Sequence, residues 1–428
     1  MNLQLIFRDK KFSPFFWTQF WGAFNDNFFK NALVVLIAFK GIHLMGLNEA
    51  SLVALAGGLF ILPFFIFSPL AGQLADKYEK SHIIRLTKLL EILVMLLAAI
   101  AFFFHSYLIL MGLLFLMGLQ SALFGPVKYS LIPELVRSER LIEGNALVEM
   151  GTFLAILLGT IGGGVFASFA SAELWIGSVL FLVSVIGYGM SRKVPPAPLG
   201  DPYLKLQWNP VREYLSLWNL LRSTRILFFS VLAISWFWFF GAGVLSVLPI
   251  YVNEYLKANE SVLTVFLAMF TLGIGIGSMI CEWVFSKKVG FRIVPLSSLA
   301  MTLFLLDLSY IGNPWPGVPQ VTLNYFFSTL LGWRLLFDFL MMSVFGGLFI
   351  VPLYTQLQQK SEKDSRSRVI AANNIFNAVF MVVTSLLIML CYKFYFNARD
   401  ILVLLAVMNG VVAICIYYFV SYKDKSLS

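Results

Sequence analysis

The sequence predicts an all-α membrane protein of twelve transmembrane helices arranged as two six-helix bundles. Three observations support this fold class: the composition, the spacing of the apolar segments and the distribution of basic residues. Of 428 residues, 59% are hydrophobic and 12% are charged, whereas soluble domains contain about 25% charged residues. A soluble core has no use for so large an apolar fraction, so we expect much of it to face lipid.

Twelve apolar segments are long enough to cross a bilayer, because about 20 helical residues span the ~30 Å hydrocarbon core. These segments are residues 14–39, 50–71, 83–104, 107–127, 146–169, 174–191, 226–251, 261–285, 291–311, 335–356, 370–392 and 400–421.

The basic residues alternate with these segments. If the N-terminus faces the cytoplasm, 25 of the 31 lysines and arginines fall on the inner side, Lys88, Lys287 and Lys288 among them. This distribution follows the positive-inside rule and places both termini in the cytoplasm. It also explains the net charge of +9, so a nucleic-acid partner is not needed. The start of the chain lacks the layout of a cleavable signal peptide, and we expect the first span to remain in the mature protein.

A proline-rich linker divides the chain. Residues 194–210 hold five of the 16 prolines, which is typical of a linker. We therefore expect three parts: an N-terminal bundle, a cytoplasmic linker and a C-terminal bundle, at residues 1–193, 194–225 and 226–428.

The end of the linker has two interpretations. Between Val211 and Leu221, the residues Tyr214, Leu217 and Trp218 share one face of a helix, with charges at its ends. This pattern is typical of an amphipathic helix on the cytoplasmic membrane surface. An ordinary loop is the alternative.

The two halves carry a weak parallel repeat. Residues 140–145 (RLIEGN) are similar to residues 368–373 (RVIAAN), and Pro126 and Pro352 end corresponding spans. Six spans followed by six, with matching features, is the arrangement of transporters that rock two bundles around a central site.

The first span holds charges near its middle. Asp26 lies about 18 Å from the start of the span at 1.5 Å per residue, where a charge costs about 2.5–3.5 kcal/mol on insertion scales. Gln19, Asp26 and Lys30 share one helical face, with Asn25 and Asn27 beside it. Charges at this depth usually line a pathway, so the pattern predicts a transporter. The alternative is that Asp26 and Lys30, four residues apart, neutralise each other and merely permit insertion.

Other polar residues within the spans are further candidates for substrate binding. They are Glu91, Gln120, Lys128, Glu149, Asn373, Asn374 and Asn377. The alternative for Lys128 is that its side chain extends the ammonium to the membrane surface. The alternative for the asparagines is that they join helices by hydrogen bonds. We expect Asp307 and Asp338 to be solvated near the outer surface.

The loop between the second and third spans, residues 72–80 (GQLADKYEK), resembles the signature of the major facilitator superfamily, G-x-L-A-D-[RK]-x-x-[RK]. The resemblance implies that Gly72, Asp76, Lys77 and Lys80 latch a cytoplasmic gate, with Asp76 near the start of the eleventh span. A second copy, Ser278 to Glu282 followed by Lys287 and Lys288, is degraded.

The glycine-rich stretch 151–164 occupies the place of the superfamily's antiporter signature but lacks its proline. Small residues that allow tight helix packing explain this stretch adequately.

Three stretches resemble the bacterial lysophospholipid transporters, including the transporter domain of acyltransferase fusion proteins. They are residues 19–30 (QFWGAFNDNFFK), residues 124–134 (FGPVKYSLIPE) and the region 352–374. The resemblance implies inward movement of lysophospholipids such as lysophosphatidylethanolamine across the bacterial inner membrane, followed by reacylation by a separate acyltransferase. In this hypothesis Lys30 binds the phosphate and Asp26 binds the ammonium of the head group.

Two other functions remain open at this stage. One is a proton-coupled exporter of hydrophobic drugs or metabolites, with Asp26 or Glu91 as the proton site; the other is a membrane scaffold or sensor. We find no nucleophile–base constellation, nucleotide loop or metal-ligand spacing, so we expect neither an enzyme nor a cofactor or metal site. Cys281, Cys391 and Cys415 are isolated, which argues against disulfides. We expect a monomer whose partners are its substrate and the membrane lipids.

Overall fold

The computed structural model describes residues 4–39, 42, 44, 46, 49–169, 171–284, 290–311, 315 and 317–426. Within these ranges the protein is mainly helical, and an isolated bridge pairs Ala258 with Val321. The predicted inner-side residues Lys287 and Lys288 lie outside the described residues.

Long helices occupy all twelve predicted spans. In the first half they are α2 (Phe12–Phe39), α3 (Glu49–Lys77), α4 (Lys80–Phe103), α5 (Tyr107–Leu135), α6 (Leu141–Ala167) and α7 (Ala172–Ser191). In the second half they are α9 (Arg225–Ile250), α10 (Glu260–Val284), α11 (Ile293–Tyr310), α13 (Leu330–Lys360), α14 (Arg366–Lys393) and α15 (Ala398–Ser426).

Short elements complete the fold, and the sequence did not predict them. They are α1 (Gln4–Phe7), α12 (Leu323–Ser328), a π-helical turn at Tyr251–Tyr255, and the 3₁₀ turns Ser138–Arg140 and Gly290–Arg292.

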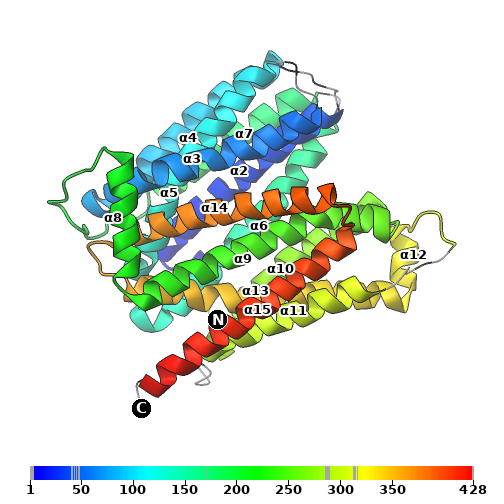
Figure 1. Cartoon of the computed structure of the whole chain (residues 1–428). Coiled ribbons are helices and arrows are strands. Elements are labelled where there is room, and N and C mark those ends of the chain that lie inside the picture. The colour runs from blue at the N-terminus through cyan, green and yellow to red at the C-terminus, as the bar shows by residue number, and fades with distance from the viewer. Residues whose placement is uncertain are drawn as a thin grey trace.

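Eleven of the long helices are apolar enough to cross a membrane by length and composition, and α2 is left out of this group. Its 28 residues include the polar group from Asn25 to Asn31, which lowers its hydropathy. It nevertheless packs beside α6 and α7 as one of the first six helices (Figure 1). The polarity of α2 therefore marks a helix shielded from lipid by its neighbours.

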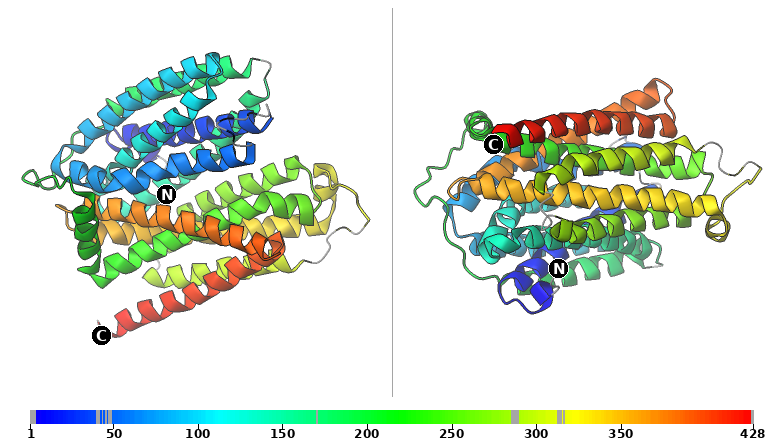
Figure 2. Two further views of the ribbon diagram at one scale, coloured as in Figure 1. Left: turned by 45° about the horizontal axis from the view of Figure 1, so that its top comes forward. Right: turned by 90° about the horizontal axis from the view of Figure 1, so that it is seen from below.

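The helices of the first half and those of the second half form two groups that lie side by side (Figures 1 and 2). The linker between them contains α8 (Pro210–Arg222), which runs across the ends of the long helices (Figure 1 and the left-hand view of Figure 2). We call this end of the molecule the linker side. Of the two interpretations of residues 211–221, the helix is confirmed, and its place on the cytoplasmic membrane surface stays a prediction. It begins with Asn209, whose side chain accepts a hydrogen bond from the Arg212 N–H at 3.2 Å, as N-cap residues do.

The helix α8 contacts both groups of helices. The hydroxyl of Tyr214 donates a hydrogen bond to the carbonyl of Phe65 in α3. The ring of Trp218 stacks on Phe376 in α14, with centroids 6.3 Å apart. Leu217 is buried beneath the helix. The linker is therefore packed against the bundles at its α8 segment.

Glycines let α6 approach α2 closely. A Cβ atom on Gly159 would lie 2.4 Å from the carbonyl oxygen of Phe24, and one on Gly163 would lie 2.6 Å from that of Phe28. These positions accept only glycine without movement of the backbone, which is the small-xxx-small packing of membrane helices. The packing interpretation of residues 151–164 is confirmed at these two positions.

The expectation that Asp307 and Asp338 are both solvated is wrong for Asp338. The Asp307 side chain is 42% exposed and pairs with Arg334 at 2.5 Å, but Asp338 is 3% exposed. Asp338 lies two turns inside α13, where the neighbouring helices cover it. The closeness of Asp338 to the end of its predicted span therefore did not indicate how deeply its side chain is buried.

Candidate substrate-binding site

A cavity of about 290 Å³ lies between the two bundles. Helices α2, α3, α4, α5 and α6 of the first bundle line it, as do α9, α13 and α14 of the second. Seven of the ten predicted substrate-binding residues are among the lining residues: Gln19, Asp26, Asn27, Lys30, Gln120, Lys128 and Asn377. Asn25, Glu149 and Asn373 are buried outside the lining. Their proposed role in direct binding therefore lacks geometric support in this conformation.

Asp26 and Lys30 face the cavity without forming an ion pair with each other. One carboxylate oxygen of Asp26 accepts a hydrogen bond from the Ser121 hydroxyl at 2.6 Å. The other is buried and has no hydrogen-bond partner within the described part of the chain. Lys30 donates to the side-chain oxygen of Asn27 at 3.3 Å and lies 5.4 Å from the ring centroid of Phe60. This arrangement speaks against the alternative in which the two residues merely neutralise each other.

A second basic group approaches the cavity from α5. The ammonium of Lys128 donates a hydrogen bond to the Thr152 hydroxyl at 2.7 Å, and Thr152 lies 2.9 Å from the side-chain oxygen of Gln19. Within the described residues, no carboxylate forms an ion pair with Lys128. Its side chain lines the cavity and does not extend to the membrane surface, because α6 and α2 hold its ammonium inside the protein.

Lys88, like Asp338, is more deeply buried than the sequence predicts. We assigned it to the inner surface, yet it is fully buried and its ammonium lies 2.6 Å from a carboxylate oxygen of Glu91. A Cβ atom on Gly22 would lie 2.3 Å from this ammonium, so the glycine in α2 makes room for it. The Lys88–Glu91 spacing of three residues inside an apolar stretch was the signal that could have revealed the pair.

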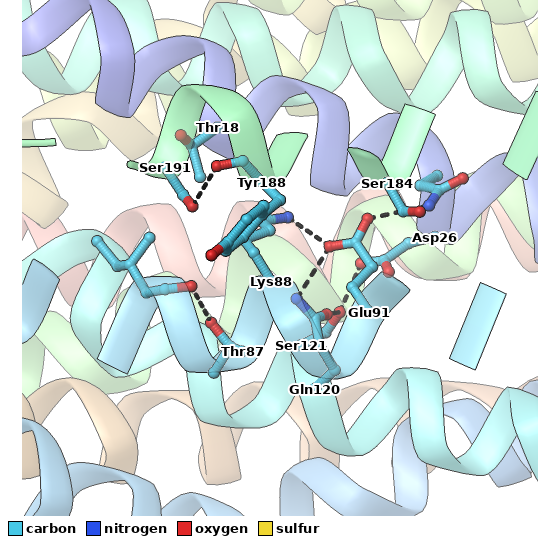
Figure 3. Close-up of polar contacts among 12 residues, drawn as sticks. Thr18, Asp26, Thr87, Lys88, Glu91, Gln120, Ser121, Ser184, Tyr188 and Ser191 are labelled. Carbon is cyan, nitrogen blue, oxygen red and sulfur yellow. Dashed lines mark hydrogen bonds and ion pairs between the residues drawn. The ribbon is translucent and has the colours of Figure 1, made fainter. Parts of the chain in front are cut away.

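Hydrogen bonds connect this buried pair to the cavity (Figure 3). Glu91 accepts from the Gln120 amide at 3.2 Å and from the Asn25 amide at 2.9 Å. The Ser121 hydroxyl lies 3.0 Å from Gln120 and 2.6 Å from Asp26. Glu91 thus anchors the groups that orient Asp26, and Asn25 acts behind the cavity wall.

The second bundle lines the cavity with neutral side chains. Asn377 accepts a hydrogen bond from the Ser235 hydroxyl at 2.9 Å, and Asn374 lies beside Gly125 of α5, where a Cβ would be 2.6 Å from its amide nitrogen. The apolar part of the wall comes from both bundles: Phe60, Ile61, Phe64, Phe124, Ile156, Trp238, Ala378 and Met381. The cavity therefore combines a charged region with an apolar wall, which suits an amphiphile.

The predicted latch residue Asp76, near the end of α3, contacts the first residues of α14, as the sequence resemblance implies. Its carboxylate accepts hydrogen bonds from the backbone N–H of Ser367 at 2.9 Å and of Arg368 at 3.1 Å, and from the Arg368 side chain at 3.1 Å. The free N–H groups and the dipole of a helix start favour such an anion. A Cβ atom on Gly72 would lie 2.6 Å from the Cβ of Ala371.

The two lysines of the predicted latch differ in burial. Lys80 is buried, whereas Lys77 is partly exposed and its ammonium lies 5.8 Å from the ring centroid of Tyr78. Their action as part of a gate stays a prediction.

Further polar contacts join the bundles on the linker side. Asn145 of α6 exchanges hydrogen bonds with Gln358 of α13 at 2.7 and 2.9 Å. The side chains of Arg366 and Glu134 form an ion pair at 3.4 Å. Every hydrogen bond or ion pair that we find between the bundles in the described ranges lies between the cavity and the linker side. The cavity is consequently closed by direct polar contacts on that side.

Comparisons with known proteins agree with this geometry. The sequence profile of the Major Facilitator Superfamily matches residues 16–333. A protein of Enterobacter sp. (strain 638) named "Lysophospholipid transporter LplT" is 26% identical over 352 residues, covering 80% of this chain and 79% of the relative. A protein of the same name from Serratia proteamaculans (strain 568) is 27% identical over 326 residues, covering 74% of this chain and 73% of the relative.

Solved structures share the fold at low sequence identity. The human organic anion transporter MFSD10 (TETRAN) aligns with a TM-score of 0.73 at 13% identity, covering 94% of this chain and 98% of that one. The transporter FucP in the outward conformation aligns with a TM-score of 0.69 at 13% identity, covering 94% and 97%. At this identity the likeness concerns the fold alone.

Proposed function

Since the chain belongs to the major facilitator superfamily, we propose that it moves lysophospholipids inward across a bacterial inner membrane by alternating access. It is an integral membrane transporter and not an enzyme. The observation that carries the choice of cargo is the cavity itself. Beside an apolar wall lie Lys30 and Lys128, which have no ion-pair partner among the described residues, and Asp26, one oxygen of which has no hydrogen-bond partner there.

The charges match the head group of lysophosphatidylethanolamine. Lys30 and Lys128 both bind its phosphate. Its ammonium binds Asp26, whose second carboxylate oxygen has no hydrogen-bond partner among the described residues. Each contact is a charge-assisted hydrogen bond, which is about twice as strong as a neutral one. Binding would replace the weak contacts that Lys30 now makes with Asn27 and the Phe60 ring.

The size and the wall of the cavity favour a lipid with one acyl chain. Ligand sites commonly measure about 300–1,000 Å³, so a cavity of about 290 Å³ suits a head group and the start of one chain. Phe60 and Phe64 of α3 and Met381 of α14 provide apolar surface for that chain.

The orientation and assembly belong to the same proposal. The linker side carries most of the basic residues that flank the spans, so it faces the cytoplasm and both termini do as well. The chain works as a monomer in contact with membrane lipids. A separate acyltransferase esterifies the delivered lysophospholipid.

Reconstituted transport tests the proposal. Purified protein in liposomes is given labelled lysophosphatidylethanolamine or its two-chain parent, with and without proton and sodium gradients. We expect uptake of the lysophospholipid well above that of empty liposomes and no uptake of the parent lipid. Equal movement of both lipids, or of neither, contradicts the proposal. Proton-driven movement of unrelated hydrophobic cations in place of the lipid supports the drug-exporter alternative.

A further inference from the structure

We infer that Tyr129 and Tyr354 form an aromatic gate that closes the cavity on the linker side, and that Glu149 is the positioning residue that holds the gate shut. The inference concerns how the cavity opens. It does not depend on the cargo proposed above.

The two rings meet across the boundary between the bundles. Tyr129 belongs to α5 and Tyr354 to α13, and their rings are parallel within 2° with centroids 4.3 Å apart. Rings at this distance are in direct contact, so no head group fits between them. Both residues line the cavity, and both are buried.

The pair lies between the cavity and the contacts on the linker side. Lys128, which binds Thr152 in the cavity wall, directly precedes Tyr129 in α5. From the opposite direction, the side-chain amide of Gln358 donates a hydrogen bond to the backbone carbonyl of Tyr129 at 3.0 Å. The rings therefore form the floor of the cavity, above the layer in which Asn145 binds Gln358.

Glu149 fixes the first ring. The Tyr129 hydroxyl donates a hydrogen bond to one oxygen of Glu149 at 2.7 Å. Glu149 is 1% exposed, does not line the cavity, and its other oxygen has no hydrogen-bond partner in the described part of the chain. A buried carboxylate is costly to keep, and orientation of the Tyr129 ring is the function that its contacts support.

The second ring is held by its own bundle. The indole N–H of Trp238 in α9 lies 3.4 Å from the Tyr354 hydroxyl, to which it donates. Glu149 belongs to α6 and moves with Tyr129, whereas Trp238 moves with Tyr354. When the bundles rock apart, each ring keeps its support and the stack between them breaks. The gate thus follows bundle movement without rearranging either half.

The accessibility of a cysteine in the cavity tests this inference. Cys281, Cys391 and Cys415 are first replaced by alanine, and Ala23→Cys provides a thiol in the cavity lining. We measure the rate at which a membrane-impermeant maleimide labels this thiol from the linker side in sealed vesicles, without any lipid substrate added.

We expect Tyr129→Ala and Tyr354→Ala each to raise the labelling rate by about tenfold, because the polar contacts on the linker side then close the cavity without the rings. Glu149→Ala should raise it by about threefold, since the Tyr129 ring is freed but still present. Glu149→Gln should keep the labelling rate of the parent protein, because the amide oxygen of the glutamine still accepts the hydrogen bond from Tyr129.

A matched control is Tyr251→Phe, which removes the hydroxyl of another fully buried tyrosine, bonded to the Leu308 carbonyl at 2.8 Å. It should leave labelling unchanged, whereas Tyr129→Phe should raise it. Unchanged labelling in both alanine variants of the tyrosine pair overturns the gate. Equal labelling of Glu149→Gln and Glu149→Ala overturns the positioning role. Neither result bears on the proposed cargo, which is tested separately by lipid uptake in the parent protein.

Discussion

The two bundles have the same helical architecture but contribute different chemistry to the cavity. All charged residues of its lining come from the first bundle: Asp26, Lys30, Lys88 and Lys128. The second bundle supplies neutral residues: Trp238, Tyr354, Asn374, Asn377, Ala378 and Met381. The difference supports the proposal that the first bundle binds the head group and the second completes the apolar wall, while each bundle contributes one ring to the proposed gate.

The charges of the first bundle are themselves of two kinds. Lys88 and Glu91 are paired and fully buried, whereas Asp26 and Lys128 face the cavity without an ion-pair partner in the described part of the chain. A paired group serves to orient its neighbours, and an unpaired group at a cavity can take a ligand. The same residue types thus have structural and binding roles within one bundle.

The largest expected effect comes from breaking the buried pair. Glu91→Ala leaves the Lys88 ammonium buried without its carboxylate, which costs about 3–5 kcal/mol in the free energy of unfolding. The double variant Lys88→Met/Glu91→Met should recover part of this loss, because apolar residues of similar volume often replace a buried ion pair without cost, although the Gln120 and Asn25 amides still lose their acceptor. Unfolding of the purified protein in detergent, followed by circular dichroism, measures both. Equal stability of Glu91→Ala and wild type would show that the pair does not behave as a buried one.

A smaller effect is expected on substrate affinity. Lys128→Ala removes a charge-assisted contact to phosphate worth about 1.5–3 kcal/mol, which raises the KM for lysophosphatidylethanolamine by about 10–100-fold. Asn377→Ala, its counterpart in the second bundle, should raise the KM by less than about tenfold because it removes a neutral hydrogen-bonding group. Initial uptake rates in liposomes give both values. A larger loss in Asn377→Ala than in Lys128→Ala would contradict the division between the bundles.

The smallest effect is expected at Glu79, the N-cap of α4 between two spans. Burial alone would raise the pKa of this carboxyl, but hydrogen bonds from Ser81, Ala197 and His82 outweigh it and lower the pKa below 4.5. A carboxyl with a lowered pKa stabilises the folded state above its unfolded pKa, and this contribution is lost as the pH falls through the folded pKa.

The thermal stability of Glu79→Gln should therefore fall slightly below that of wild type at pH 6 and approach it as the pH drops below about 4.5. Melting temperatures across this pH range provide the measurement. A difference between the two proteins that stays constant with pH would refute the role of the charge.

The sequence predicted the helices well because a span needs about 20 mostly apolar residues, a condition that all the long helices but α2 meet clearly. It also identified Asp26 and Lys30, since a charge in mid-span is rare and conspicuous. Lys88 escaped notice because it lies near a span end, where a count of basic residues cannot distinguish an exposed lysine from a buried one. Asn25 and Asn27 look equivalent in sequence, and only the folded structure shows that Asn25 donates a hydrogen bond to Glu91 of α4 behind the wall.

The gate residues were beyond sequence reasoning for a different reason. Tyr129 and Tyr354 are 225 positions apart, and aromatic residues within spans are too common to suggest a contact. Glu149 was predicted to touch the substrate because it is a polar residue within a span. Its hydrogen bond to Tyr129 gives that explanation through another residue.

The most direct test of head-group recognition by the first bundle compares two lipids in wild type and in Asp26→Asn. Uptake of lysophosphatidylethanolamine, which carries an ammonium, is measured beside that of lysophosphatidic acid, which lacks one. We predict that wild type prefers the ammonium-bearing lipid, and that Asp26→Asn loses this preference while still moving lysophosphatidic acid. An unchanged preference in Asp26→Asn would contradict the account, because the carboxylate would then have no part in recognising the cargo.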